Sequence, residues 1–221
     1  MRLLGRRVPY PNQSDAIFLL HELFVNLSYA FDARSPAPRI VDCGANIGMS
    51  VLFFKAWSPE ASVLAIEPDA EAFRYLQHLI ALNGLRGVEL MNVAIARERG
   101  IADFYSGPQG AGIQASLHPD WGGASAARVA TIPLSDVIQG PIDLLKLDIE
   151  GAEYDAIEDL ERHDRLRWIR ELIVECHDRH ADAAPRRRLI QQLGNAGLRT
   201  SVVHQEGQIA VLHAARVSDS T

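Results

Sequence analysis

The chain has 221 residues, 48% of them hydrophobic, and a formal net charge of -6 at pH 7. A chain of this length can bury one substantial core, so we expect a single α/β domain with one active site. The acidic balance argues against a nucleic-acid partner, because phosphate recognition needs a clustered basic face. Cys43 and Cys176 close separate apolar runs, which fits a reducing compartment, and no apolar run reaches bilayer-spanning length. We therefore expect a cytoplasmic protein without a membrane span.

The N-terminal part of the chain predicts a short arm followed by a helix. Residues 14–31 place apolar side chains at helical spacing, and Ser14 or Asp15 can accept hydrogen bonds from the first-turn amides. Pro36 and Pro38 then break the pattern and lead into an extended strand. Residues 1–38 are expected to form an arm and a helix that pack on the main domain.

The main domain is expected to span residues 39–215, where apolar strands alternate with amphipathic helices. The expected strands lie at 40–43, 62–66, 88–92, 142–148 and 172–176, and the expected helices at 49–57, 70–82, 152–160 and 185–196. This β-α-β order predicts a parallel sheet with right-handed crossovers. Two apolar runs near the end of the chain, at 199–204 and 208–213, predict a hairpin. Residues 216–221 are expected to form a flexible tail.

A Gly/Ser-rich stretch at 106–127 separates two further candidate strands, 101–105 and 128–132. A loop of this length in a compact domain is more often functional than inert. Its glycines would permit closure over a cofactor or an acceptor, with contacts from Gln114, Ser116, His118 and Trp121. A disordered insertion is the alternative interpretation.

The strongest local signal is a buried strand that runs into a glycine turn and then a helix, at residues 40–48. Gly44, Asn46 and Gly48 are candidate cofactor-binding positions, because such a turn lets backbone amides approach a ligand at a helix N-terminus. A purely structural turn is the alternative. Asp42 favours binding, since a carboxylate there would repel a pyrophosphate but would pair with the amino group of an aminoacyl cofactor.

The second strand ends in Glu67 and Pro68, about 20 residues after the glycine turn, which is the spacing at which an acidic side chain meets a ribose. We expect Glu67 to accept both ribose hydroxyls, although a surface charge is the simpler interpretation of an isolated glutamate. Asn92, at the end of the third strand, could bind the adenine edge or form an Asx turn.

Around the fourth strand, Lys146, Asp148 and Glu150 are spaced by two residues and should share one face. They would emerge at the carboxyl edge of the sheet, where open α/β folds bind ligands. A buried lysine without a partner is costly, so an ion pair with a neighbouring carboxylate is expected, either structural or catalytic.

Three blocks, at 41–48, 65–68 and 145–153, together resemble the FkbM family of methyltransferases. The resemblance implies a class I methyltransferase Rossmann-like fold: a mostly parallel seven-stranded sheet flanked by helices, in the order 3-2-1-4-5-7-6 with strand 7 antiparallel. It also implies S-adenosyl-L-methionine as cofactor and O-methylation of a sugar, glycolipid, polyketide or other natural product. The chain departs from the family pattern at Cys43, where a small apolar residue is commoner.

Methyl transfer requires alignment of the acceptor and removal of its proton. The candidate catalytic residues are Asp148, Glu175, His177 and Lys146, at the ends of the fourth and fifth strands. His177 could act as general base, oriented by Glu175. Alternatively, Asp148, Glu175 and His177 could hold Mg²⁺.

Two other functions compete with methyl transfer. A nicotinamide-dependent oxidoreductase would share the fold class, but the turn at Gly44 lacks G-x-G-x-x-G spacing. A non-catalytic cofactor-binding module is the third hypothesis, disfavoured by intact Asp148, Glu175 and His177. The expected partner is a small-molecule or glycan acceptor, and the sequence leaves a homo-oligomer open.

Overall fold

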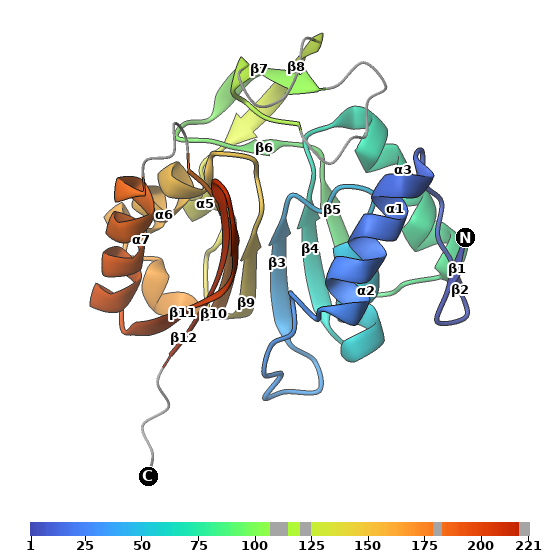
Figure 1. Ribbon diagram of the computed structural model, residues 1–221, viewed down its shortest axis with the longest axis horizontal. Helices are drawn as coiled ribbons and strands as arrows, with labels where there is room; N and C mark the ends of the chain where they lie inside the picture. Colours follow the sequence, from blue (N-terminus) through green and yellow to red (C-terminus); the bar gives the residue numbers. More distant parts are fainter. Residues whose placement is uncertain (107–114, 120–124, 179–182, 217–221) are drawn as a thin grey trace.

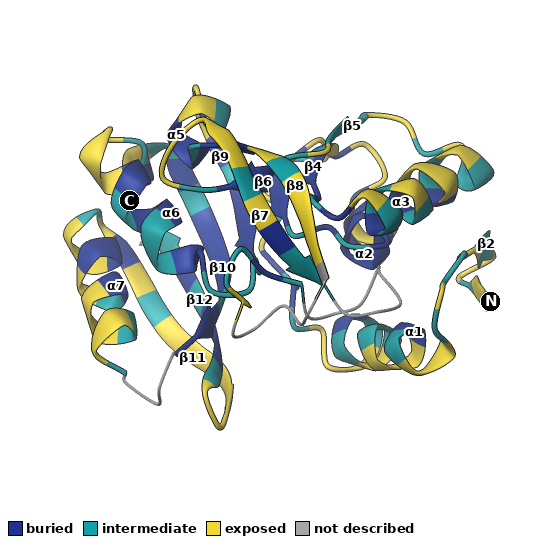
Figure 2. Cartoon of the chain, turned by 90° about the horizontal axis from the view of Figure 1, so that it is seen from above, coloured by how far each residue is buried: buried dark blue, intermediate teal, exposed yellow. Residues whose placement is uncertain are grey.

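The computed structural model describes residues 1–106, 115–119, 125–178 and 183–216. The chain folds into a central sheet with helices on both faces (Figure 1). Buried strands run through the middle, and the outer helices turn exposed faces to solvent (Figure 2). The apolar residues form two clusters, one on each face of the sheet. This is the α/β architecture that alternating strands and helices predict.

The central sheet has seven strands in the order β11-β12-β10-β9-β3-β4-β5. The strands are β3 (Arg39–Cys43), β4 (Ser62–Ile66), β5 (Val88–Met91), β9 (Ile142–Leu147), β10 (Ile169–His177), β11 (Leu198–Glu206) and β12 (Ile209–Arg216). β12 is antiparallel to both of its neighbours, whereas the other pairs are parallel. The predicted order 3-2-1-4-5-7-6 with an antiparallel seventh strand is therefore confirmed. Because β12 extends to Arg216, this residue belongs to the sheet and not to the expected tail.

The helices that cover the sheet are α2 (Met49–Trp57), α3 (Ala70–Asn83), α5 (Leu134–Val137), α6 (Glu153–Arg162) and α7 (Ala184–Asn195), with a 3-10 turn, η2 (Leu166–Trp168). α2 and α3 pack on one face, and α5, α6 and α7 on the other. Local signals set their ends: Asp69 accepts hydrogen bonds from the first-turn amides of α3, and Gly84 ends that helix in a left-handed conformation. No helix in the described part of the chain is long and apolar enough to cross a membrane.

A second sheet lies over the carboxyl edge of the central one (Figure 1). It contains β6 (Ala94–Ile95), β7 (Gly100–Ser106) and β8 (Ser125–Ile132), in the order β6-β8-β7. β7 and β8 are antiparallel, which confirms the two extra strands that the apolar runs predicted. Most of the loop predicted at 106–127, with Gln114 and Trp121, lies outside the described residues.

The N-terminal segment begins with a small hairpin, β1 (Arg2–Leu3) and β2 (Arg6–Arg7), followed by α1 (Gln13–Leu20) and a π-helical turn, η1 (His21–Val25). The predicted helix at 14–31 is thus too long, because Leu27 adopts a left-handed conformation with φ 56° and turns the chain. The N-cap is also corrected: Asn12, and not Ser14 or Asp15, accepts the hydrogen bond from the Ser14 amide. The residues after Leu27 consequently run along the face that α2 covers, where Tyr29 and Phe31 are buried.

Candidate active site

A cavity lies over the carboxyl ends of β3, β4, β9 and β10. Gly44, Glu67, Asp148 and Glu175 contribute to its floor from these four strand ends. The N-terminal segment and β6 add largely apolar walls. A ligand site at this edge is the arrangement expected for an open parallel sheet.

The glycine turn places backbone against the cavity, and it also lies close to the backbone of Asp148, just beyond the end of β9. A Cβ atom on Gly44, whose φ is +84°, would lie 1.8 Å from the Asp148 carbonyl oxygen. Gly44 and Asn46 line the cavity. Gly48 does not: a Cβ there would meet the Leu76 side chain at 2.8 Å, so this glycine permits packing of α2 against α3. Two of the three predicted turn positions therefore reach the cavity.

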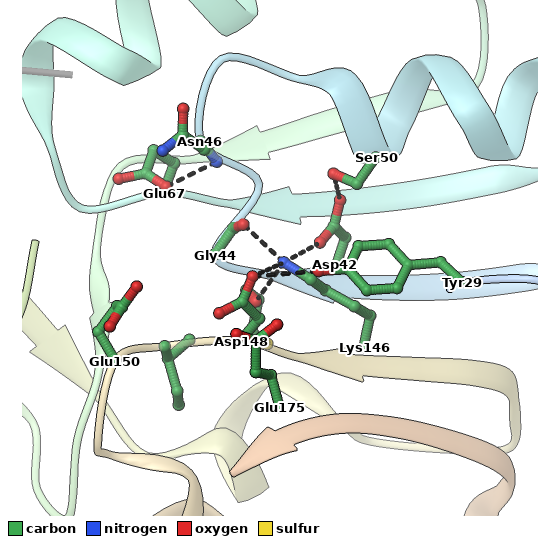
Figure 3. A network of polar contacts seen from close by, with 12 residues as sticks. Tyr29, Asp42, Gly44, Asn46, Ser50, Glu67, Lys146, Asp148, Glu150 and Glu175 are labelled. Carbon is green, nitrogen blue, oxygen red and sulfur yellow. Dashed lines mark hydrogen bonds and ion pairs between the residues drawn. The ribbon is translucent and has the colours of Figure 1, made fainter. Parts of the chain in front are cut away.

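Glu67 follows β4 and lines the cavity beside Pro68. Its carboxylate accepts a hydrogen bond from the amide of Asn46 at 2.8 Å (Figure 3) and another from the amide of Asp69 at 2.8 Å. Burial raises the pKa of Glu67 to about 7, partly offset by these two bonds. The carboxylate is thereby held rigidly against the glycine turn, as the ribose-binding hypothesis requires.

Asn92 does not line the cavity, and its predicted contact with an adenine edge is not supported by its placement. Its side-chain amide donates to the carbonyl oxygens of Glu67 (2.8 Å) and Pro68 (3.1 Å). These bonds fasten the loop after β4, so the role is closer to the structural alternative. Val93 and Ala94, the next residues in the chain, line the cavity instead.

Lys146 is buried at the centre of a polar network in the cavity floor, where it is itself a lining residue (Figure 3). Its Nζ lies 3.4 Å from both Asp42 Oδ1 and Asp148 Oδ2, and it donates to the Gly44 carbonyl oxygen at 2.7 Å. Burial alone would lower the pKa of Lys146, but the charges of Asp148 and Asp42 outweigh it and raise the pKa above its ordinary value. The predicted ion pair is confirmed.

Asp42 has a different place from the one predicted. Its side chain is fully buried, accepts a 2.6 Å hydrogen bond from Ser50, and does not line the cavity. The period of two along β3 turns Asp42 toward α2, where Ser50 donates to its Oδ2 and Lys146 supplies a counter-charge 3.4 Å from its Oδ1. The expected direct pairing of Asp42 with a cofactor amino group is thus corrected to an interior role in the network.

His177, at the end of β10, is enclosed by carboxylates. Its Nδ1 lies 3.0 Å from Glu153 Oε1, and its Nε2 lies 3.2 Å from Glu150 Oε2 and 3.7 Å from Glu175 Oε1. Burial favours the neutral ring, but the hydrogen bond to Glu153 and the charges of Glu153, Glu150 and Asp148 raise the pKa of His177 to about 10. An imidazolium cannot accept a proton, so the general-base hypothesis for His177 is disfavoured. The residue that orients its Nδ1 is Glu153, and not Glu175 as expected.

The predicted face shared by Lys146, Asp148 and Glu150 is only partly correct. β9 ends at Leu147, and Glu150 has a left-handed backbone with φ 52°. Beyond the strand the period of two no longer applies, and the Glu150 side chain points away from Lys146 (Figure 3). Its carboxylate lies 3.2 Å from His177 Nε2 instead. Ser116, from the predicted loop, donates to the Glu150 carbonyl oxygen at 2.5 Å.

The family model described as the methyltransferase FkbM domain matches residues 42–196. The chain belongs to the FkbM methyltransferase family. The resemblance carried by the three sequence blocks is therefore confirmed.

Similar sequences carry methyltransferase names. Methyltransferase sdnD of Sordaria araneosa is 31% identical over 196 residues, covering 73% of this chain and 74% of that protein. The 31-O-demethyl-FK506 methyltransferase FkbM of Streptomyces tacrolimicus is 29% identical over 210 residues, covering 79% of each chain.

Two solved structures are similar in fold. Methyltransferase FkbM from Methylobacillus flagellatus has a TM-score of 0.57 and 17% identity, over 83% of this chain and 45% of that one, so this chain spans less than half of its length. The fibrillarin of Aeropyrum pernix, solved with natively bound S-adenosyl-L-methionine, has a TM-score of 0.53 and 14% identity, over 88% and 74% of the two chains. These similarities confirm the class I methyltransferase fold.

In this methyltransferase, three predicted residues converge at the cavity. Each of Asp148, Glu175 and His177 offers one atom that could bind a metal ion, and these three atoms all lie within 4.8 Å of one another. Burial and the neighbouring charge of Asp148 raise the pKa of Glu175 to about 9. The sequence prediction that these side chains meet is confirmed.

Sequence reasoning missed Tyr29 and Glu22, which reach the methyltransferase cavity from the N-terminal segment. Tyr29 donates a hydrogen bond to Asp148 Oδ2 at 3.1 Å. Burial, and next the charge of Asp148, raise the pKa of Tyr29 well above its ordinary value, so it remains a donor. Helical spacing indicated mainly packing for this segment, and no local pattern distinguished these two residues from their neighbours.

Proposed function

We propose that this methyltransferase transfers the methyl group of S-adenosyl-L-methionine to a hydroxyl group of a sugar, glycolipid, polyketide or other natural product. The observation that carries the proposal is that two groups of residues line the same cavity. A rigid carboxylate, Glu67, stands beside a glycine turn. The Asp148 carboxylate stands at a neighbouring strand end, next to the carboxyl group of Glu175, whose raised pKa favours the protonated form. The first group suits a ribose and an aminoacyl chain, and the second suits proton removal from an acceptor.

On the cofactor side, Glu67 would accept hydrogen bonds from both ribose hydroxyls, since the amides of Asn46 and Asp69 already fix its orientation. Gly44 and Asn46 would offer backbone to the aminoacyl part, and Pro68 an apolar edge. The missing side chain at Gly44 fits this role, because a Cβ there would enter the space between β3 and β9.

On the acceptor side, the bound cofactor would supply an activated methyl group. Its methyl carbon could be taken up by the acceptor oxygen, with the electron pair of the carbon–sulfur bond left on sulfur. The residues of this chain would accept the proton that the acceptor hydroxyl loses. Asp148 is the proposed proton acceptor, with Glu175 beside it, and Lys146 holds Asp148 in place from below. The name of the Streptomyces tacrolimicus relative, 31-O-demethyl-FK506 methyltransferase, supports an oxygen acceptor.

Glu67→Gln is expected to weaken binding of S-adenosyl-L-methionine by about 10-fold, because a neutral amide cannot accept hydrogen bonds on both of its heteroatoms. Titration calorimetry with S-adenosyl-L-methionine and, separately, with NAD⁺ measures this. Glu71→Gln is the matched control, since Glu71 lies outside the cavity. Binding of NAD⁺ alone would overturn the methyltransferase cofactor, and equal affinities in both variants would remove Glu67 from the site.

The affinity for S-adenosyl-L-methionine is expected to fall as pH decreases through the pKa of Glu67, which burial raises to about 7. Below that pH the carboxyl group of the free protein is protonated, so binding must first remove a proton, and the dissociation constant rises by at most about 10-fold per pH unit. Calorimetry across this range should show a steeper pH dependence for the wild type than for Glu67→Gln. Parallel curves would contradict the assignment.

A second candidate role of the acidic cluster is a divalent-cation site for Mg²⁺, favoured by the convergence of Asp148, Glu175 and His177 donor atoms within 4.8 Å. The contact of Glu153 with His177 Nδ1 would orient Nε2 toward such an ion. We expect calorimetry to show saturable binding of Mg²⁺ or Mn²⁺, and we expect Glu175→Gln to abolish this binding. Methyl transfer should also be lost when a chelator is added. Full activity in the chelator would leave proton acceptance as the role of the cluster.

A further inference from the structure

The N-terminal segment, residues 13–31, forms one wall of the cavity although it lies outside the region 42–196 that matches the family. Leu19, Glu22, Leu23 and Tyr29 of this segment line the cavity. Among them, Tyr29 contacts the polar network directly, next to Lys146 and Asp148 (Figure 3).

Tyr29 is held rigidly by packing. The side chain is 3% exposed, and its ring stacks on Phe54 of α2 with centroids 6.4 Å apart and an interplanar angle of 24°. Phe31, two residues later, packs edge-on against the same Phe54 ring at 6.2 Å. The left-handed turn at Leu27 starts the irregular stretch that carries both rings to α2. The position of the Tyr29 hydroxyl is therefore set by the core and not by a mobile surface loop.

Two groups approach the same oxygen of Asp148. The Tyr29 hydroxyl donates to Oδ2 at 3.1 Å, and Lys146 Nζ lies 3.4 Å from Oδ2. Lys146 also lies 5.3 Å from the centroid of the Tyr29 ring, within range of a cation–π contact. Asp148 follows the end of β9, so its side chain needs such contacts to hold one rotamer at the cavity.

We propose that Tyr29 is a positioning residue for methyl transfer, which orients the Asp148 carboxylate toward the acceptor hydroxyl. This inference rests on the proposed function, in which Asp148 accepts the acceptor proton. A proton acceptor must lie within hydrogen-bonding distance of the proton it takes, so rotation of Asp148 away from the acceptor slows transfer. The N-terminal segment is then a part of the active site that the family match does not include.

Tyr29→Phe tests this with little disturbance, because phenylalanine keeps the stack on Phe54 and the ring beneath Lys146. We expect turnover at saturating S-adenosyl-L-methionine to fall by about 10-fold, with the cofactor dissociation constant and the melting temperature almost unchanged. Tyr154→Phe is the matched control: it removes a hydroxyl that donates to Asp178 at 2.5 Å, outside the cavity, and should leave turnover unchanged.

A double-mutant cycle separates positioning from a general structural effect. Turnover is followed as S-adenosylhomocysteine formed with the best hydroxylated acceptor from a screen, or with water if no acceptor reacts. In an Asp148→Asn background, Tyr29→Phe should cause no further loss. Equal losses in the two backgrounds, or no loss in Tyr29→Phe alone, would overturn the inference. A wild-type protein that binds no S-adenosyl-L-methionine would instead overturn the proposed function.

Discussion

Lys146→Met is expected to lower the free energy of unfolding by about 3–5 kcal/mol, the range for removing one partner of a buried ion pair. The Lys146 side chain is 2% exposed and lies 3.4 Å from Asp42, whose side chain is fully buried. Without the lysine, Asp42 retains the Ser50 hydroxyl as a partner but has lost its counter-charge. Urea unfolding followed by circular dichroism measures the change.

The other lysine of the chain provides the control for this experiment. Lys55 is also buried, but its Nζ donates to the carbonyl oxygen of Ala61 at 2.7 Å. Lys55→Met is expected to cost about 1–2 kcal/mol, because it leaves a neutral acceptor unpaired and not a charge. Lys146→Met combined with Asp42→Asn should recover part of the lost stability. Equal losses for the two lysine variants would show that the Asp42 pair contributes little.

Gly44→Ala is expected to destabilise the protein by about 4 kcal/mol and to abolish cofactor binding, from left-handed backbone strain and overpacking together. The added Cβ would lie 1.8 Å from the carbonyl oxygen and 2.9 Å from the carbonyl carbon of Asp148. Both neighbours are backbone atoms, so relief requires β3 and β9 to separate at the cavity floor. Thermal unfolding and calorimetry with S-adenosyl-L-methionine measure the two effects.

Gly84→Ala measures the cost of a left-handed backbone conformation for alanine without the steric clash that is expected at Gly44. Gly84 has a φ of +57°, and a Cβ there would meet nothing within 4 Å. This variant should cost about 1–2 kcal/mol and retain cofactor binding. If Gly44→Ala were no more harmful than Gly84→Ala, the close approach of Gly44 to Asp148 would not be essential.

Much of the fold could be predicted from the chain because its local patterns agree with one another. Strands buried on both faces give continuous apolar runs, such as 63–66, and helices between them give three- to four-residue spacing. Helix α2 and strand β4 have the predicted bounds, and the closing hairpin turns at Gly207, whose φ is 57°. The N-terminal helix was predicted too long, because apolar spacing does not reveal a left-handed residue such as Leu27.

The sequence by itself determined the order of strands and helices along the chain, the glycine turn and which acidic residues end the parallel strands, whereas the strand order within the sheet was implied by the resemblance to the FkbM family. Parallel strands bring their carboxyl ends to one edge, so Glu67, Asp148, Glu175 and His177 could be placed at the cavity from their positions alone.

Only the tertiary structure decided which way each side chain points and which groups pair. Glu153 pairs with His177, and these residues are 24 positions apart in the chain. Asp42 pairs with Lys146 across 104 positions, and Tyr29 contacts Asp148 across 119 positions. Such contacts depend on how the layers pack and on the exact end of each strand, and neither is written in a local pattern of residues.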